Sequence, residues 1–189
     1  MGRAGLTAER LVRAGAELAD EIGFERVTLS ELARGFDVKV ASLYSHLKNS
    51  HDLKTRIALL ALEEMADQAA DAVAGRSGKD ALAAYAGVFR DYARRHPGRY
   101  ASAQFPLDTE TALAGAGVRH ARMTRAILRG YDLVEPEETH AVRLLGSLFH
   151  GYVSLENAGG FSHSAPDSQE SWERAVDALD SLLRNRPTP

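Results

Sequence analysis

Apolar residues recur at helical spacing along almost the whole chain, and the alternation typical of β-strands is nearly absent. In the first stretch Thr7 is placed to cap a helix and Gly23 to end it. The apolar residues between them share one helical face: Leu11, Ala14, Gly15, Leu18 and Ile22. The pattern predicts an all-α fold.

Caps and turn residues divide the chain into about nine predicted helices. Thr28 and Glu31 fit a capping box at the start of the second helix, and Gly75-Arg76-Ser77-Gly78 is the clearest break. The helices are expected near residues 7–22, 28–35, 39–45, 49–73, 79–95, 97–104, 110–130, 136–158 and 168–185. We therefore expect a helix-turn-helix three-helix domain in residues 1–50 and a C-terminal helical bundle in residues 51–189.

The composition is that of an ordinary globular chain, with 44% hydrophobic and 26% charged residues. The absence of cysteine excludes disulfides, thiolate metal sites and thiol nucleophiles. The longest aliphatic run, Ile57 to Leu62, is far shorter than the roughly 20 residues of a membrane helix, and no signal peptide is visible. We expect a cytoplasmic protein that binds no membrane. Its net charge of -3 gives no hint of nucleic-acid binding, so local geometry must decide that question.

A short capped helix, a turn over residues 35–38 and a second short helix follow one another between Thr28 and Ser45. This order is typical of a helix-turn-helix, whose second helix enters the major groove of DNA. The exposed side chains of that helix are small, polar or basic, which lets its backbone approach base edges: Lys39, Ala41, Ser42 and Ser45. The pattern alone leaves a second interpretation open, a small three-helix unit that never contacts DNA.

Three runs of sequence carry a family resemblance: Val27-Thr28-Leu29-Ser30-Glu31-Leu32-Ala33, Leu43-Tyr44-Ser45-His46-Leu47 and Lys48-Asn49-Ser50-His51-Asp52-Leu53. Together they resemble the DNA-binding domain of the tetracycline-repressor (TetR) family over residues 7–55. Three positions depart from the family pattern. Asp37 stands for the turn glycine, Lys39 for the serine or threonine that opens the recognition helix, and Leu47 for a closing aromatic.

The resemblance implies a homodimeric transcription regulator, usually a repressor, that binds a pseudo-palindromic operator in double-stranded DNA. By matching positions, five residues would face the major groove: Lys39, Val40, Ala41, Ser42 and Tyr44. Four would lie near phosphates: Thr28, Ser30, His46 and Lys48. For His46 another interpretation stays open, a histidine that packs between helices.

The segment from Phe89 to Tyr100 resembles a C-terminal regulatory domain in one branch of the family, whose Trp-His-Gly motif reads Phe149-His150-Gly151 here. We expect the bundle to bind a small, largely apolar effector of unknown identity, because aromatic residues with a few polar groups suit such ligands. The candidate ligand-binding residues are Tyr85, Phe89, Tyr92, Gln104, Phe105, Met123, Ile127, Phe149 and His150. The alternative is that this aromatic stripe is plain core.

The last two long helices are expected to form the dimer interface, as a four-helix bundle about a two-fold axis. The candidate interface residues are Leu144, Leu148, Tyr152, Leu155, Trp172, Val176, Leu179 and Leu183. The alternative is that each stripe packs only within its own subunit. Arginines at helical spacing, among them Arg90 and Arg99, are predicted to lie on solvated faces. The alternative is that an anionic effector uses one of them.

Enzymatic interpretations find little support. Glu137-Glu138-Thr139-His140 contains one Glu-x-x-His, but a di-iron site needs a second pair and further carboxylates. Lys79 follows a glycine-containing loop that lacks the spacing of a P-loop. We therefore predict no enzyme, no cofactor and no metal. The remaining alternative to a DNA-binding regulator is a helical dimer that binds a small molecule without binding DNA.

Overall fold

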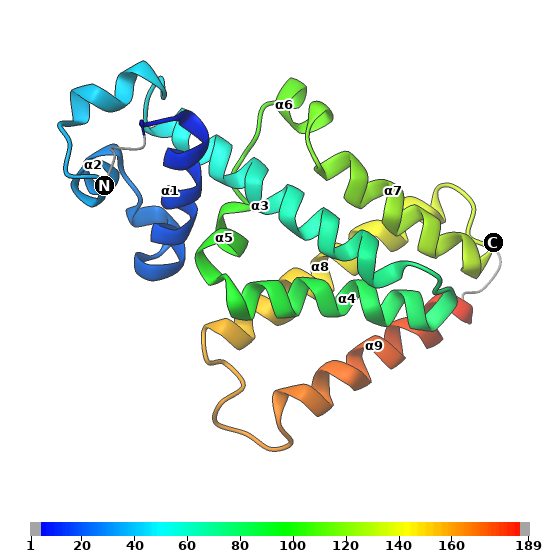
Figure 1. The fold of residues 1–189 in the computed structure, drawn as a ribbon. Helices are drawn as coiled ribbons and strands as arrows, with labels where there is room; N and C mark the ends of the chain where they lie inside the picture. Colours follow the sequence, from blue (N-terminus) through cyan, green and yellow to red (C-terminus); the bar gives the residue numbers. More distant parts are fainter. Residues whose placement is uncertain (1–4, 186–189) are drawn as a thin grey trace. The chain divides into compact units, whose positions relative to one another are not determined.

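The computed structural model describes residues 5–185, and every regular element in this range is a helix (Figure 1). The chain divides into two compact units. The N-terminal unit contains the residues up to Glu64 together with Arg95–Ala116, and the C-terminal unit contains Met65–Arg94 and the residues from Gly117 onward. The all-α prediction is confirmed. Residue 50, the expected domain boundary, is the first residue of the long helix α3 (Ser50–Val73).

The N-terminal unit begins with α1 (Ala8–Ile22), which Thr7 caps by accepting a hydrogen bond from the backbone N–H of Arg10 at 3.2 Å. Gly23 ends α1 at a φ of 89°, a backbone conformation that favours glycine. Then come the 3₁₀ helix η1 (Phe24–Arg26), α2 (Leu29–Gly35), the 3₁₀ helix η2 (Val40–Ser45) and the first part of α3. Two short helices complete the unit, α5 (Pro97–Ser102) and α6 (Thr109–Ala114).

The core of this unit holds the apolar faces of α1, α2, η2 and α3. Its buried residues are Leu11, Val12, Ala16, Ala19, Phe24, Val27, Leu29, Leu32, Ala33, Leu43, Leu47, Leu53 and Ile57. Leu47 is 1% exposed, so the leucine at the family's aromatic position also serves as core. This packing fixes the helix-turn-helix elements against α1.

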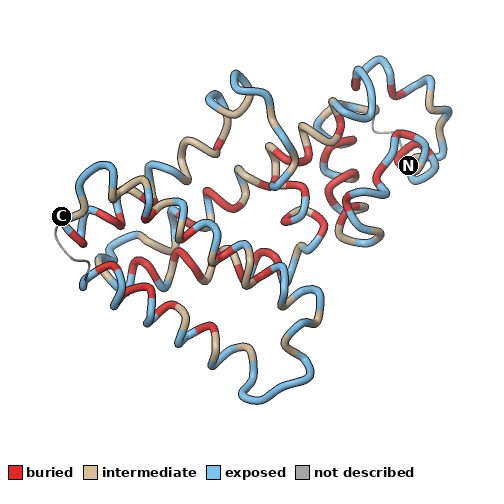
Figure 2. Tube along the Cα trace, turned by 180° about the vertical axis from the view of Figure 1, so that it is seen from behind, coloured by how far each residue is buried: buried red, intermediate tan, exposed pale blue. Residues whose placement is uncertain are grey.

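The C-terminal unit contains the rest of α3 with α4 (Gly78–Arg95), α7 (Gly117–Leu128), the 3₁₀ helix η3 (Arg129–Tyr131), α8 (Glu137–Asn157) and α9 (Ser168–Arg184). Buried residues recur at regular intervals along these helices, with exposed residues between them (Figure 2). The core includes Tyr85, Leu128, Leu145, Phe149 and Trp172. None of the helices in residues 5–185 is both long and apolar enough to cross a membrane.

The single helix predicted over residues 110–130 is wrong, because the chain forms α6 and α7 with a break at Gly115. Gly115 has an extended backbone, with φ −93° and ψ 179°, and it ends α6. A Cβ at this position would lie 3.0 Å from the Leu59 side chain, so the break sits where only a small residue fits closely. The helical period continues across the glycine, which is why the pattern did not reveal it.

Candidate functional site

The helix-turn-helix begins at Thr28, whose hydroxyl accepts a hydrogen bond from the backbone N–H of Glu31 at 3.1 Å. This half of the predicted capping box is confirmed. The carboxylate of Glu31 forms an ion pair with Arg34 one turn further along α2, in place of the bond back to the cap. Thr28 and Ser30 are exposed at this end of α2.

The turn after α2 contains Asp37 in the left-handed conformation, at a φ of 51°. The N–H of Asp37 donates to the carbonyl of Arg34 at 3.2 Å, and the N–H of Val38 donates to the carbonyl of Ala33 at 3.1 Å. These bonds satisfy carbonyls at the end of α2 and reverse the chain. Aspartate therefore performs the backbone role of the glycine that the family pattern places here, because it tolerates positive φ better than most residues.

The recognition element is the 3₁₀ helix η2, and Lys39 occupies its cap position without a side-chain cap bond. Lysine has no acceptor for the first backbone N–H groups, so the family's cap is missing. Leu43 is fully buried and anchors η2 to the core. Lys39, Ala41 and Ser42 are exposed, Tyr44 is 58% exposed and Val40 is half-buried. Ser45 donates its hydroxyl to the carbonyl of Ser42 at 2.9 Å.

The start of α3 is capped reciprocally, which fixes the segment that follows η2. The N–H of Asp52 donates to Asn49 Oδ1 at 2.8 Å, and the N–H of Lys48 donates to Asp52 Oδ2 at 2.9 Å. Burial raises the pKa of Asp52, but hydrogen bonds from Arg56 and from the Lys48 backbone outweigh it and hold that pKa below its usual value. Lys48 is exposed beside this cap, and His46 is half-buried.

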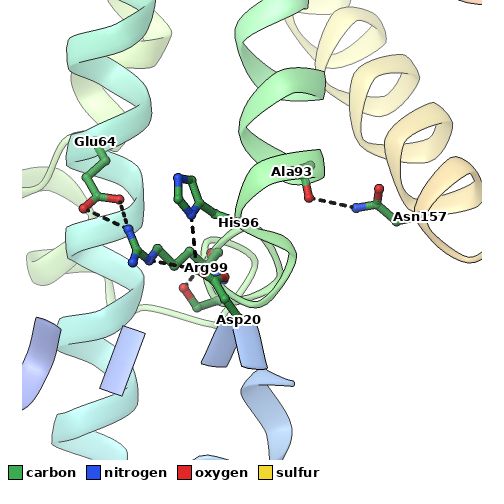
Figure 3. Close-up of polar contacts among 7 residues, drawn as sticks. Asp20, Glu64, Ala93, His96, Arg99 and Asn157 are labelled. Carbon is green, nitrogen blue, oxygen red and sulfur yellow. Dashed lines mark hydrogen bonds and ion pairs between the residues drawn. The ribbon is translucent and has the colours of Figure 1, made fainter. Parts of the chain in front are cut away.

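A junction between α1 and α5 was not predicted as a site from the sequence. The Asp20 carboxylate accepts the backbone N–H of Arg99 at 2.9 Å and lies 3.2 Å from His96 Nδ1 and 3.1 Å from Arg99 Nε. Arg99 also forms an ion pair with Glu64 at 3.3 Å, and its side chain lies between Asp20 and Glu64 (Figure 3). The sequence signal was present in His96-Pro97-Gly98, which lies in the segment from Phe89 to Tyr100 that resembles the C-terminal regulatory domain.

Gly98 is the closest point of this junction. A Cβ at Gly98 would overlap the backbone carbonyl group of Ala19, so only glycine allows α5 to approach α1 this closely. The prediction that Arg99 lies on a solvated face is wrong, because its side chain is 16% exposed and paired.

Five of the nine predicted ligand-binding residues meet in one region of the C-terminal unit. Tyr85, Ile127 and Phe149 belong to its core, and Phe89 and Met123 pack against that core. Ring centroids of Tyr85 and Phe89 lie 5.1 Å apart, and those of Phe89 and Phe149 lie 5.7 Å apart. The sequence therefore identified an aromatic cluster.

The other four predicted ligand-binding residues are placed differently. Tyr92 is fully buried in α4, and His150 is exposed on α8. Gln104 and Phe105 belong to the N-terminal unit, where the ring of Phe105 packs against Phe24 at 5.7 Å and His51 at 5.2 Å. Phe105 thus helps to hold α3 and η1 together.

A polar trio lies beside the aromatic cluster, and of its members the sequence analysis selected Tyr85 and missed His120 and Thr124. Thr124 donates its hydroxyl to Tyr85 Oη at 3.0 Å or to the carbonyl of His120 at 2.9 Å, and Tyr85 Oη lies 3.4 Å from His120 Nδ1. Burial raises the pKa of Tyr85 to about 12, so its phenol is neutral at physiological pH. The signal was the i, i+4 spacing of His120 and Thr124, which places both on one face of α7.

The predicted dimer residues divide into two groups. Trp172, Val176, Leu179 and Leu183 are buried within the chain's own core, so little of their surface is left for a partner. Leu144, Leu148 and Tyr152 on α8 are half-buried, and Leu155 is 55% exposed. Leu182 on α9 is 49% exposed, although it was not among the predicted interface residues.

A buried ion pair connects α4 with α8. Arg90 donates two hydrogen bonds to the carboxylate of Glu156, at 2.8 Å and 2.7 Å, and a third to the side chain of Gln169 at the start of α9. The bond from Arg90 lowers the pKa of Glu156 below its usual value. The prediction of a solvated face is wrong for Arg90, which is 3% exposed. In residues 5–185, no group of three histidine or acidic side chains is arranged to hold a metal ion.

A helix-turn-helix in the N-terminal unit and a separate helical unit with an aromatic core define a class: two-unit, all-α regulators. Residues 82–179 match the family model of the tetracyclin repressor-like C-terminal domain. The chain is 31% identical to the uncharacterized HTH-type transcriptional regulator YobS of Bacillus subtilis over 181 residues, which cover 95% of this chain and 88% of that protein. It is also 31% identical to the uncharacterized HTH-type transcriptional regulator Rv0681 of Mycobacterium tuberculosis, over 82% of this chain and 72% of that protein.

The chain therefore belongs to the TetR family of transcriptional regulators. A solved TetR variant from Acinetobacter baumannii in complex with minocycline has the same fold, with a TM-score of 0.73, 20% identity, and coverage of 97% of this chain and 100% of that one. Members of the family bind DNA operators and form dimers, and they are not enzymes. The protein is a ligand-responsive, DNA-binding transcriptional regulator.

Proposed function

We propose that this regulator is a cytoplasmic homodimeric repressor, released from a pseudo-palindromic operator when a small effector binds its C-terminal unit. The observation that carries the proposal is the exposed face of η2, which presents Lys39, Ala41, Ser42 and Tyr44 outside the core of the unit. The small side chains at positions 41 and 42 allow the backbone to approach base edges. Buried Leu43 holds this face in a fixed orientation.

Residues at both ends of the helix-turn-helix are suited to the DNA backbone. Thr28 and Ser30 offer hydroxyl groups at the start of α2, and Lys48 offers an ammonium group before α3. Such contacts position a protein on DNA without reading its sequence. We assign His46 a weaker role, because it is half-buried between Leu43 and Leu47 in the chain.

The exposed apolar surface of α8 and α9 supports the dimer. Leu144, Leu148 and Leu155 follow one another at i, i+4 and i+11 along α8, which places them on one face. Leu182 adds an exposed apolar side chain on α9. Two copies of this helix pair would bury these leucines in a four-helix bundle and place two recognition helices on one operator.

The polar trio of Tyr85, His120 and Thr124 supports an effector with a hydrogen-bonding group on an apolar body. Phe89, Met123, Ile127 and Phe149 would contact that body. Tyr85 and Thr124 are neutral side chains that can each donate and accept a hydrogen bond. An uncharged ligand that exchanges bonds with them avoids the cost of burying an ion.

The α1–α5 junction supports a route from effector to DNA. Helix α4 carries Tyr85 and Phe89 and leads directly into α5 at Pro97, and α5 contacts α1 through Gly98 and Asp20. An effector that prefers one position of α4 would thereby change the equilibrium between DNA-binding and released forms. The size of this change in the equilibrium is set by the difference between the effector's affinities for the two forms.

The test is a gel shift of the purified protein against DNA that flanks its own gene, repeated over a salt series. We expect a sequence-specific shift whose affinity falls steeply with salt. Tyr44→Ala should weaken the affinity for this DNA. Val134→Ala should leave the affinity unchanged, because it alters a side chain that is 70% exposed and lies outside the helix-turn-helix. If neither this DNA nor any genomic fragment is bound specifically, the alternative of a helical dimer that binds only a small molecule is favoured.

A further inference from the structure

A groove of about 250 Å³ lies within the C-terminal unit, lined by the end of α3, the start of α4 and one side of α7. Its buried and half-buried side chains are apolar and come from all three helices: Val73, Ala81, Met123 and Ile127. Ala126 and Gly130 line the remaining side with little or no side chain, so the groove stays open. The volume lies just below the range of drug-sized sites, about 300–1,000 Å³, so the groove suits a small ligand.

The exposed end of this groove is polar. Arg76 and Ser77 line it from the loop between α3 and α4, and both are exposed. The backbone N–H of Arg76 donates to the carbonyl of Val73 at 3.0 Å, which holds the start of the loop against α3. Within residues 5–185, the guanidinium of Arg76 forms no hydrogen bond or ion pair with another side chain.

The charge of the lining favours an anion. Arg76 is the one charged residue among the described residues that line the groove, so the lining has a net charge of +1. A planar guanidinium can donate two parallel hydrogen bonds to one carboxylate, and the hydroxyl of Ser77 can donate another. An apolar surface that ends at such donors is complementary to a ligand with an apolar body and one acidic end.

We propose that this groove binds a small carboxylate with an apolar body. Val73, Met123 and Ile127 contact the body, and Arg76 and Ser77 hold the carboxylate at the exposed end. Because the acidic group stays at this end, binding does not require the burial of an ion. The site is distinct from the effector site of the proposed function, since no member of the polar trio lines the groove.

The experiment measures the binding of octanoate to the full chain by isothermal titration calorimetry, with octanol and octylamine as probes of equal chain length. Octanoate should bind most tightly of the three, and its affinity should fall as salt is raised, whereas that of octanol should not. Arg76→Ala should weaken octanoate binding about fivefold, the upper range for an exposed ion pair, and leave octanol binding unchanged. Arg76→Lys should keep most of the octanoate affinity, because the charge remains.

Three further variants locate the ligand. Ala126→Leu fills part of the groove and should weaken octanoate and octanol alike by about tenfold, since each methylene kept out costs about fourfold in affinity. Arg122→Ala changes an exposed arginine of α7 that does not line the groove, and it should leave both affinities unchanged. Tyr85→Phe alters the polar trio and should also leave them unchanged. Thermal melting checks that every variant is folded.

Several results would overturn the proposal. They are the absence of octanoate binding, equal affinities for octanoate and octylamine, and equal losses of octanoate affinity in Arg76→Ala and Arg122→Ala. A loss of octanoate affinity in Tyr85→Phe but not in Arg76→Ala would place the ligand at the polar trio and would also overturn it. The calorimetry needs no DNA, so absence of operator binding would overturn the proposed function alone.

Discussion

The two units of this protein hold their helices together by different means. In the N-terminal unit α5 reaches α1 because Gly98 has no side chain, and the Asp20 carboxylate that joins them is 17% exposed. In the C-terminal unit α4 is joined to α8 by Arg90, whose side chain is 4% exposed and donates two bonds to Glu156, whose side chain is 13% exposed. A partly hydrated contact can change at low cost, whereas a desolvated pair cannot separate without leaving a buried charge. The α1–α5 contact is therefore suited to a junction that moves, and the Arg90–Glu156 pair is suited to holding α4 and α8 in one arrangement.

The largest effect is expected from Arg90→Ala, which leaves the Glu156 carboxylate without its buried partner. Removing one member of such a pair lowers the free energy of unfolding by about 3–5 kcal/mol. Chemical denaturation followed by circular dichroism measures this decrease. The matched control is Arg94→Ala, which changes an exposed arginine one turn further along α4. It should change the free energy of unfolding by less than about 0.5 kcal/mol.

Arg99→Ala tests the contrast between the units directly. Its partners Asp20 and Glu64 are 17% and 26% exposed, so water can solvate them once the guanidinium is gone. The decrease in unfolding free energy should be smaller than that for Arg90→Ala. Equal decreases in unfolding free energy for the two variants would contradict the distinction between the partly hydrated α1–α5 junction and the desolvated Arg90–Glu156 pair.

Gly98→Ala should separate α5 from α1, because the added methyl group meets the Ala19 backbone. Overpacking of this kind costs about 1–3 kcal/mol of unfolding free energy, and operator affinity should fall as well because α1 supports the helix-turn-helix. Denaturation and gel shift together measure both effects. Gly87→Ala on α4, where a Cβ meets nothing within 4 Å, should instead stabilise the protein by about 0.5–1 kcal/mol.

The smallest effect on the free energy of unfolding is expected from Tyr85→Phe, and it is confined to alkaline pH. Burial raises the pKa of the Tyr85 phenol from 10.0 to about 12 in the folded protein, so folding favours the neutral form. The stability that this group contributes is complete below pH 10 and is lost as pH rises toward 12. Tyr85→Phe should therefore flatten part of the decline in unfolding free energy over this interval. Tyr44→Phe, at a side chain 58% exposed, is the control and should leave the decline as in wild type.

Much of the N-terminal unit could be predicted because its signals are local. Thr7, Gly23 and Thr28 act on backbone groups within a few residues of themselves, and the structure shows each in the predicted role. The left-handed turn at Asp37 follows from the same short-range logic. The sequence pattern did not predict that η2 is a 3₁₀ helix, and Lys39 occupies its cap position without a side-chain cap bond.

The buried polar contacts could not be predicted, since they join residues far apart in the chain. Arg90 and Glu156 are 66 positions apart, and Asp20 and Arg99 are 79 positions apart. Helical periodicity places each residue on a face but does not say which other helix covers that face. For that reason Arg90 and Arg99 were assigned to solvent.

The sequence by itself determined the all-α class, most helix boundaries and the helix-turn-helix, because periodicity, caps and turn residues act through neighbouring backbone groups. Only the tertiary structure decided that Trp172 and Leu183 fill the chain's own core while Leu155 and Leu182 stay exposed. It likewise placed Phe105 with Phe24 and joined Tyr85, His120 and Thr124 into one polar trio. The physical reason is that burial and long-range hydrogen bonds depend on which helices pack together, and no single helix contains that information.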